Sequence, residues 1–131
     1  MALEIVAAKD LNHAFEIVSV SPRKTMKHHV VSEPEGMGGF LYDNRNALAN
    51  YTFYYQFDPY REIQLEADQV SAIKTFSRSI VKWIEEHGTE ENRVIQQYGL
   101  SFPKIRRFAG ELGHVCDVAM EHGYGLSGLG D

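Results

Sequence analysis

The strongest structural signal in this chain is the segment DQVSAIKTFSRSIVKWIEEHG, residues 68–88. Its apolar side chains, from Val70 to Ile84, recur at intervals of three and four residues, which is the period of one face of an α-helix. Asp68 is a residue type that caps helix N-termini, and His87 with Gly88 is a typical helix end. The segment therefore predicts a long amphipathic helix that covers a hydrophobic core.

Two further helices are predicted after this segment. Thr89, followed by two acidic residues, predicts the start of a shorter helix that ends at Gly99. Ser101 predicts the cap of a final helix that stops at Gly123. The final helix has an apolar stripe at helical spacing, formed by Ile105, Phe108, Ala109, Leu112, Val115, Cys116 and Ala119. The tail, residues 124–131, is rich in glycine, and we expect it to be loose.

The residues before the long helix indicate strands, because short runs of β-branched and aromatic residues alternate with turn residues. In residues 51–58 the side chains alternate, so that Tyr51, Phe53, Tyr55 and Phe57 share one face, which we interpret as core, and Tyr54 faces the other way. The predicted strands are Glu4–Ala8, Phe15–Val20, His28–Ser32, Phe40–Asp43, Tyr51–Asp58 and Arg61–Leu65. We therefore predict an α+β fold, in which an N-terminal antiparallel sheet of about four to five strands is packed by a long helix and a C-terminal helical pair.

Composition is that of an ordinary folded domain. The chain has 131 residues, of which 44% are hydrophobic and 24% charged. We expect one domain over residues 1–131, with mainly strands in 1–67, mainly helices in 68–123 and a flexible tail in 124–131. The start of the chain lacks the basic flank and long apolar core of a secretory signal, no apolar run is long enough to cross a bilayer, and Cys116 is the only cysteine. These features predict a cytoplasmic protein without membrane association.

A basic corner is the first candidate binding site. The residues QQYGLSFPKIRRF, 96–108, place paired Arg106 and Arg107 at the start of the final helix, directly after Gly99 and Ser101. The segment Glu91–Leu112 resembles a helix-turn-helix, and that resemblance implies a nucleic-acid reader in which these arginines reach bases or phosphates. The flanking residues Arg93 and Lys104 would then share the corner.

Other features of the same segment favour a simpler interpretation. Ile95 stands where the helix-turn-helix motif takes a small residue, and the later half of the final helix is acidic. The formal net charge of −5 also argues against a protein coated in nucleic acid, although a local basic patch is compatible with it. The alternative is therefore a helical corner whose arginines are solvated.

A second basic run, Arg23, Lys24 and Lys27, leads into His28 and His29. It is typical either of a solvated turn or of a loop that binds a phosphate or an acidic surface. If the fold brings the two basic runs together, they suit a nucleotide or another small polyanion, with Tyr54 stacked on its base.

Signals for catalysis and metal binding are weak. Glu111 and His114 form one E-x-x-H, whereas two-iron sites need two copies on facing helices. Cys116 lies within an apolar stripe, where a thiol is inert. The glycine-rich loop 36–39 precedes a predicted strand, so it lacks the helix terminus on which a phosphate-binding loop depends. We predict no cofactor and no metal, and a catalytic role is disfavoured.

These observations predict a non-catalytic binding protein that forms a homo-oligomer and recognises an anionic partner through the basic helical corner. The partner is a nucleotide-like small molecule, a nucleic acid or an acidic protein surface, and inhibition of another protein stays open within this reading. The alternatives are a DNA-binding regulator that uses residues 91–112 and a small enzyme without a linear motif. The predicted ligand-binding residues are Arg106, Arg107, Lys104, Ser101, Arg93, Arg23, Lys24, Lys27 and Tyr54.

Overall fold

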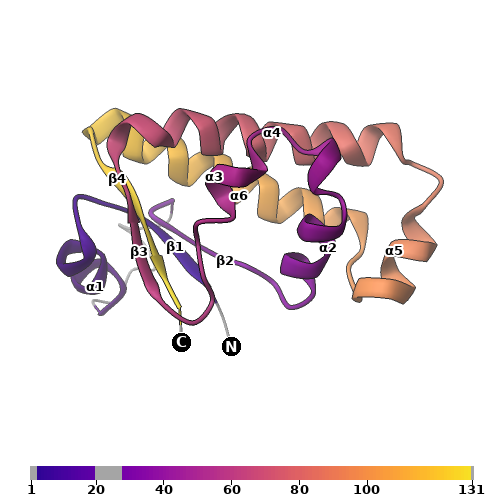
Figure 1. Ribbon diagram of the computed structural model, residues 1–131, viewed down its shortest axis with the longest axis horizontal. Helices are drawn as coiled ribbons and strands as arrows, with labels where there is room; N and C mark the ends of the chain where they lie inside the picture. The colour runs from indigo at the N-terminus through magenta and orange to yellow at the C-terminus, as the bar shows by residue number, and fades with distance from the viewer. Residues whose placement is uncertain (1–2, 20–27, 131) are drawn as a thin grey trace.

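The computed structural model describes residues 3–19 and 28–130 and confirms the predicted α+β class (Figure 1). In chain order the elements are β1 (Glu4–Ala8), α1 (Leu11–Ser19), β2 (Val30–Ser32), α2 (Met37–Asp43), the 3-10 turn η1 (Arg45–Ala47), α3 (Tyr51–Tyr54), β3 (Glu62–Leu65), the 3-10 turn η2 (Ala67–Gln69), α4 (Val70–Glu86), α5 (Glu91–Tyr98), α6 (Phe102–His122) and β4 (Gly125–Leu129). The four strands form one antiparallel sheet in the order β2-β1-β4-β3. Within the described residues, no helix is long and apolar enough to cross a bilayer.

Both faces of the sheet are covered. The antiparallel pair of α4 and α6 packs over one face, and α1 packs against the other (Figure 1). Ile5 and Ala7 of β1 belong to the main core, while Val6 and Ala8 belong to a smaller cluster with Ile17 of α1. Because side chains alternate along a strand, burial on both faces explains why β1 reads as an uninterrupted apolar run.

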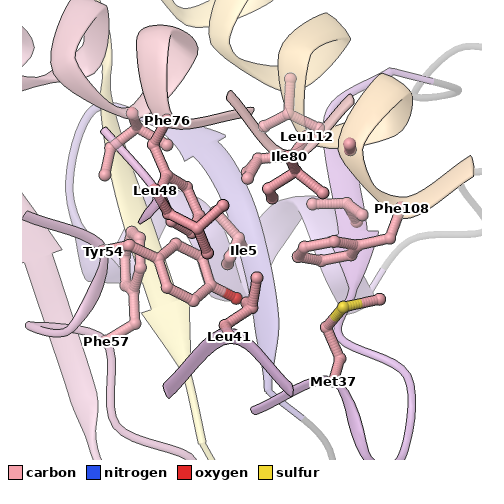
Figure 2. Close-up of a cluster of buried hydrophobic side chains, with 14 of the residues drawn as sticks. Ile5, Met37, Leu41, Leu48, Tyr54, Phe57, Phe76, Ile80, Phe108 and Leu112 are labelled. Carbon is pink, nitrogen blue, oxygen red and sulfur yellow. The ribbon is translucent and has the colours of Figure 1, made fainter. Parts of the chain in front are cut away.

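The main core lies between the sheet, the α4–α6 pair and the short helices α2 and α3. Figure 2 shows Phe76 of α4, Phe108 and Leu112 of α6 and Ile5 of β1 around the same interior, and all four are buried. Tyr54 of α3 stacks on Phe76, with ring centroids 4.6 Å apart. Burial of each large side chain of this kind contributes about 1.5–3 kcal/mol relative to exposure, so the cluster is the main source of stability.

The helices predicted after residue 67 are confirmed. The seven residues of the predicted stripe of α6 are all buried, Ser101 caps the helix, and Gly123 ends it in the left-handed conformation (φ 71°). Gly99 ends α5 in the same way (φ 72°). Two predicted caps are wrong. Asp68 lies inside η2, where the Gln69 side chain accepts a hydrogen bond from the Glu66 N–H at 3.2 Å. Glu90, and not Thr89, directly precedes α5.

The predicted strand Phe15–Val20 is wrong, because its described part belongs to α1. The side chain of Asp10 accepts a hydrogen bond from the His13 N–H at 2.8 Å and so starts the helix. Ala14 and Ile17 point into the smaller cluster, whereas Phe15 is 45% exposed. The apolar residues therefore follow helical rather than strand spacing once residues 11–14 are included.

The predicted strands Phe40–Asp43 and Tyr51–Asp58 are also wrong. The first is the helix α2, which buries Met37, Phe40 and Leu41 at helical spacing. The second is the single helical turn α3 followed by further turns, so Tyr54 is buried and Tyr55 is exposed. Short apolar runs fit either period, and here the contacts with α4 and α5 select the helix. The N-terminal half therefore contains three helices as well as three strands.

The predicted loose tail is wrong as well, since residues 125–129 form β4, which lies between β1 and β3. Its glycines allow close packing: a Cβ on Gly128 would lie 2.5 Å from Cδ1 of Phe57, and a Cβ on Gly125 would collide with the Leu65 carbonyl. Glycine is therefore required at these two positions because the Phe57 ring and the Leu65 backbone leave no room for a side chain. It does not indicate flexibility here.

Candidate functional site

The start of α6 is closed by acceptors of the protein itself. The Ser101 hydroxyl accepts a hydrogen bond from the Lys104 N–H at 3.3 Å, and the Glu91 carboxylate accepts one from the Phe102 N–H at 2.8 Å. These contacts satisfy two of the free N–H groups that every helix N-terminus presents. Anion binding at this position therefore has to depend on side chains, and Ser101 has a structural role.

The basic side chains of this turn point outward. Lys104, Arg106 and Arg107 are exposed, while Ile105 and Phe108 between them are buried, as the helical period requires. Among the described residues, none of the three forms a salt bridge. We call Lys104, Arg106 and Arg107 the basic corner.

Arg93 does not share this corner as a free charge. Its guanidinium donates to Glu90 at 2.7 Å and to Gln97 at 3.2 Å, both on its own helix or directly before it. An exposed pair of this kind is held by neighbours on the same helical face. The predicted contribution of Arg93 is therefore reduced by a local carboxylate.

The second basic run, Arg23, Lys24 and Lys27, lies wholly outside the described residues. His28, which follows it, lies against His114 of α6, with ring centroids 4.9 Å apart. His114 is seven residues after Arg107 on the same face of the helix, a rise of about 10 Å. The exposed Glu111 lies between them on that face.

A shallow groove of about 230 Å³ between α4 and α6 continues the line of the basic corner. The small residues Ala109, Gly110 and Gly113 form its floor, and Arg106 precedes the first of them by one helical turn. Lys74 and Arg78 of α4 also line the groove, and Lys74 forms a 2.5 Å salt bridge with Asp117. Sequence reasoning missed these two residues, because only the register between α4 and α6 places them beside α6.

Tyr54 is not exposed for stacking on a base, so that prediction is wrong. It keeps only 4% of its surface exposed, stacks on Phe76 and donates its hydroxyl to Glu33 at 2.5 Å. Burial, together with the nearby Glu33 charge, raises the pKa of Tyr54 well above its usual value. The phenol is therefore neutral and acts as a donor within the core.

A second candidate site adjoins Tyr54. A pocket of about 180 Å³ is lined mainly by aromatic rings, together with one carboxylate and three small or aliphatic residues. Its lining residues are Tyr42, Tyr51, Tyr54, Tyr55, Phe57, Glu33, Leu3, Gly38 and Pro59. Burial raises the pKa of Glu33, and the hydrogen bond from Tyr54 partly opposes that shift. We call this cavity the tyrosine pocket. Its aromatic density is visible in the sequence, but the approach of Glu33 depends on the tertiary fold.

Histidines from distant parts of the chain gather near the sheet edge at β2 and the end of α6. The ring centroids of His29 and His122 are 6.2 Å apart, and those of His13 and Tyr124 are 5.1 Å apart. Burial, followed by the nearby His122, His13 and His28, lowers the pKa of His29. Among residues 3–19 and 28–130, no set of three or more His, Cys, Asp or Glu side chains is arranged to hold a metal ion.

The only cysteine is embedded in the core. Cys116 is fully buried in α6, and burial raises the pKa of its thiol to about 12. A thiol with so high a pKa carries almost no thiolate at neutral pH and is a poor nucleophile. Cys116 is therefore not a candidate for covalent chemistry.

No known protein family, curated protein or solved structure matches the chain.

Proposed function

We propose that this protein is a non-catalytic binding protein that recognises an anionic partner through the basic corner. The observation that carries the proposal is the exposure of Lys104, Arg106 and Arg107 on the first two turns of α6, without a salt bridge among the described residues. Guanidinium groups bind phosphates and carboxylates through two parallel hydrogen bonds. A guanidinium without a salt-bridge partner breaks no ion pair when it binds such a group.

The shape of the surface favours an extended partner over an enclosed one. The adjoining groove measures about 230 Å³, which is smaller than the ~300–1,000 Å³ of pockets that enclose a drug-sized molecule such as a nucleotide. An anionic surface laid along α6 would contact Arg106 and Arg107 and then reach Arg78 across the groove. Because the whole chain carries a net charge of −5, such a contact depends on the local patch and is weakened by salt.

The test compares the wild type with the double variant Arg106→Ala/Arg107→Ala. Binding to a duplex DNA pool, to a nucleotide panel and to an acidic peptide is measured by fluorescence anisotropy at about 50 and about 200 mM salt. Loss of both guanidiniums is expected to weaken the wild-type interaction about tenfold or more at low salt, with a shallower salt dependence.

The matched control is Arg61→Ala, which removes an exposed arginine from the region of β3, where it pairs with Asp58 at 3.8 Å. This variant is expected to bind like the wild type. Equal losses in Arg61→Ala and in the double variant would mean that only net charge matters, and the basic corner would then not be the site.

A DNA-binding regulator remains the second candidate, favoured by the left-handed Gly99 between α5 and α6 and by the burial of Leu100 and Ile105 behind it. Two features weigh against it: Ile95 is 41% exposed, and α5 packs chiefly on α2. Enrichment of one duplex sequence from the pool would favour this candidate, whereas uniform binding of all duplexes would favour the general anion-binding role.

Self-association is part of the proposal and is supported by the exposed aromatic side chains Phe15 and Tyr60. Sedimentation at increasing protein concentration tests it. A constant monomer mass would remove the homo-oligomer from the proposal without affecting the basic corner.

A further inference from the structure

The tyrosine pocket combines aromatic walls with a partly buried carboxylate. Tyr51 lies 5.7 Å from Tyr55 and 6.5 Å from Tyr54, and Tyr42 lies 6.4 Å from Tyr55, measured between ring centroids. The rings come from α2, α3 and the residue after α3, so two short helices hold them around one opening. Tyr42 and Tyr55 are 45% and 63% exposed and form its rim.

Glu33 is the only charged residue in the lining of this pocket. Tyr54 donates to one of its carboxylate oxygens, and the other lies against α2, 3.2 Å from where a Cβ on Gly38 would be. Among the described residues, no lysine, arginine or histidine forms a salt bridge with Glu33. A partly buried carboxylate without a cationic partner is costly, and a positively charged ligand would offset that cost.

A cation already lies on one of these rings. The Arg45 guanidinium carbon is 4.0 Å from the centroid of the Tyr42 ring, and its Nη1 donates to the Tyr42 carbonyl at 2.8 Å. Arg45 lines the adjoining hollow with Tyr42, Tyr51, Thr52 and Tyr55, and it is not part of the tyrosine pocket itself. The contact shows that a cation packs on the Tyr42 ring within this fold, on the side of the adjoining hollow.

The size of the pocket limits the ligand to a small group. Its volume of about 180 Å³ corresponds to roughly six water molecules at ~30 Å³ each. Apolar walls and a single carboxylate suit a charge that carries methyl or methylene groups, because a bare ammonium would lose hydration without regaining enough hydrogen bonds.

We propose that the tyrosine pocket binds an alkylammonium group, with its alkyl substituents against Tyr42, Tyr51 and Tyr55 and its charge facing Glu33. This site is separate from the basic corner, takes a ligand of opposite charge and does not depend on the function proposed above.

The first test uses choline as a cationic probe and 3,3-dimethylbutan-1-ol as its neutral isostere. Binding is followed by NMR through the amide of Gly38 and the tyrosine rings, in the full chain. Choline is expected to shift these signals with an affinity about tenfold higher than that of the isostere, a ratio equivalent to about 1.4 kcal/mol. Equal affinity for both compounds, or no shift with choline, would overturn the proposal.

Variants locate the interaction. Glu33→Gln keeps the shape of the side chain and an acceptor for Tyr54, and it is expected to weaken choline binding about fivefold or more while the neutral isostere binds as before. Tyr55→Ala removes an exposed rim ring and is expected to weaken choline binding as well. Unchanged choline binding in both variants would overturn the assignment.

The matched controls are Glu35→Gln and Tyr60→Ala, which change an exposed acid and an exposed tyrosine that do not line the pocket. Both are expected to bind choline like the wild type, and thermal unfolding of every variant confirms that it is folded. A loss in Glu35→Gln equal to that in Glu33→Gln would mean that general surface charge attracts the probe, which would also overturn the proposal.

The alkylammonium group can belong to a free small molecule or to a modified lysine side chain. A short peptide that contains trimethyllysine, compared with choline and with the same peptide carrying unmodified lysine, separates these sources. Tighter binding of the methylated peptide than of choline assigns a protein-borne group, and equal affinities assign a small molecule. Tighter binding of the unmodified peptide than of both would contradict an alkyl-lined cation site.

Discussion

At the scale of single residues, Glu33 is expected to destabilise the folded protein at neutral pH. Its carboxyl has a pKa above the ordinary value of 4.5, because burial disfavours the charge. The folded state thus binds the proton more tightly than the unfolded state. The stabilising contribution of this group is complete below pH 4.5 and is lost as the pH rises through the folded-state pKa.

Replacement of this residue tests that sign. Glu33→Gln cannot ionise and still accepts the hydrogen bond from Tyr54, so we expect a higher free energy of unfolding than the wild type at about pH 7. The difference should shrink as the pH falls through the folded-state pKa and then below 4.5, where the wild-type carboxyl becomes neutral in the unfolded state as well. Urea unfolding at several pH values measures it. A variant less stable than the wild type at neutral pH would contradict the expected cost of burying this charge.

At the scale of elements, β4 needs glycine at position 128, where the Phe57 ring packs against the strand. Gly128→Val would place a Cβ 2.5 Å from Cδ1 of the Phe57 ring, in a strand that pairs on both edges. Overpacking of this kind costs about 1–3 kcal/mol. We therefore expect the free energy of unfolding to fall by about that amount, measured as a lower urea midpoint.

A second glycine provides the contrasting case. Gly110 lies on the exposed side of α6, and a Cβ there would have no neighbour within 4 Å. Gly110→Ala is therefore expected to stabilise the protein by about 0.5–1 kcal/mol, because glycine loses more conformational freedom in a helix than alanine does. Similar losses of stability in both variants would show that the packing of Phe57 is not what distinguishes the two positions.

Element length explains which parts of the fold could be predicted from the sequence. The helices α4 and α6 are long enough for Ile73, Ile80 and Leu112 to establish a helical period, and Ser101 and Gly123 give the ends of α6. Short runs such as the one at Phe40 fit either period, so tertiary contacts decide their structure. The glycines of β4 resemble those of a loose tail, and only the neighbours of Gly125 and Gly128 show why the strand needs them.

The candidate sites also contain residues that the sequence predicts and residues that only the tertiary structure reveals. The outward direction of Arg106 and Arg107 follows from the apolar stripe of their own helix, so the sequence alone predicts it. The place of Arg78 depends on the register between α4 and α6, and the contact of Glu33 with Tyr54 joins residues 21 positions apart. Local spacing therefore predicts exposure within one helix, whereas chemistry shared between elements requires the tertiary structure.

At the scale of the whole molecule, histidines from three parts of the chain gather at one end. His13 comes from α1, His28 and His29 from the segment before β2, and His122 from the last turn of α6. Nδ1 of His29 is buried and has no hydrogen-bond partner among the described residues. A proton on His29 would be desolvated and would face the other three rings, so protonation opposes the folded arrangement.

This arrangement predicts a loss of stability in mild acid. The pKa of His29 lies below its ordinary value of 6.5 in the folded state, so the unfolded state takes up the proton first. The free energy of unfolding should therefore fall as the pH decreases from 6.5 toward the folded-state pKa and then level off. His29→Gln cannot take up this proton, so its stability should change less over the same interval. Urea unfolding between about pH 7.5 and about pH 5 measures both proteins. A wild-type profile as flat as that of His29→Gln would mean that His29 does not couple folding to protonation, and a steep profile in both would assign the coupling to other groups.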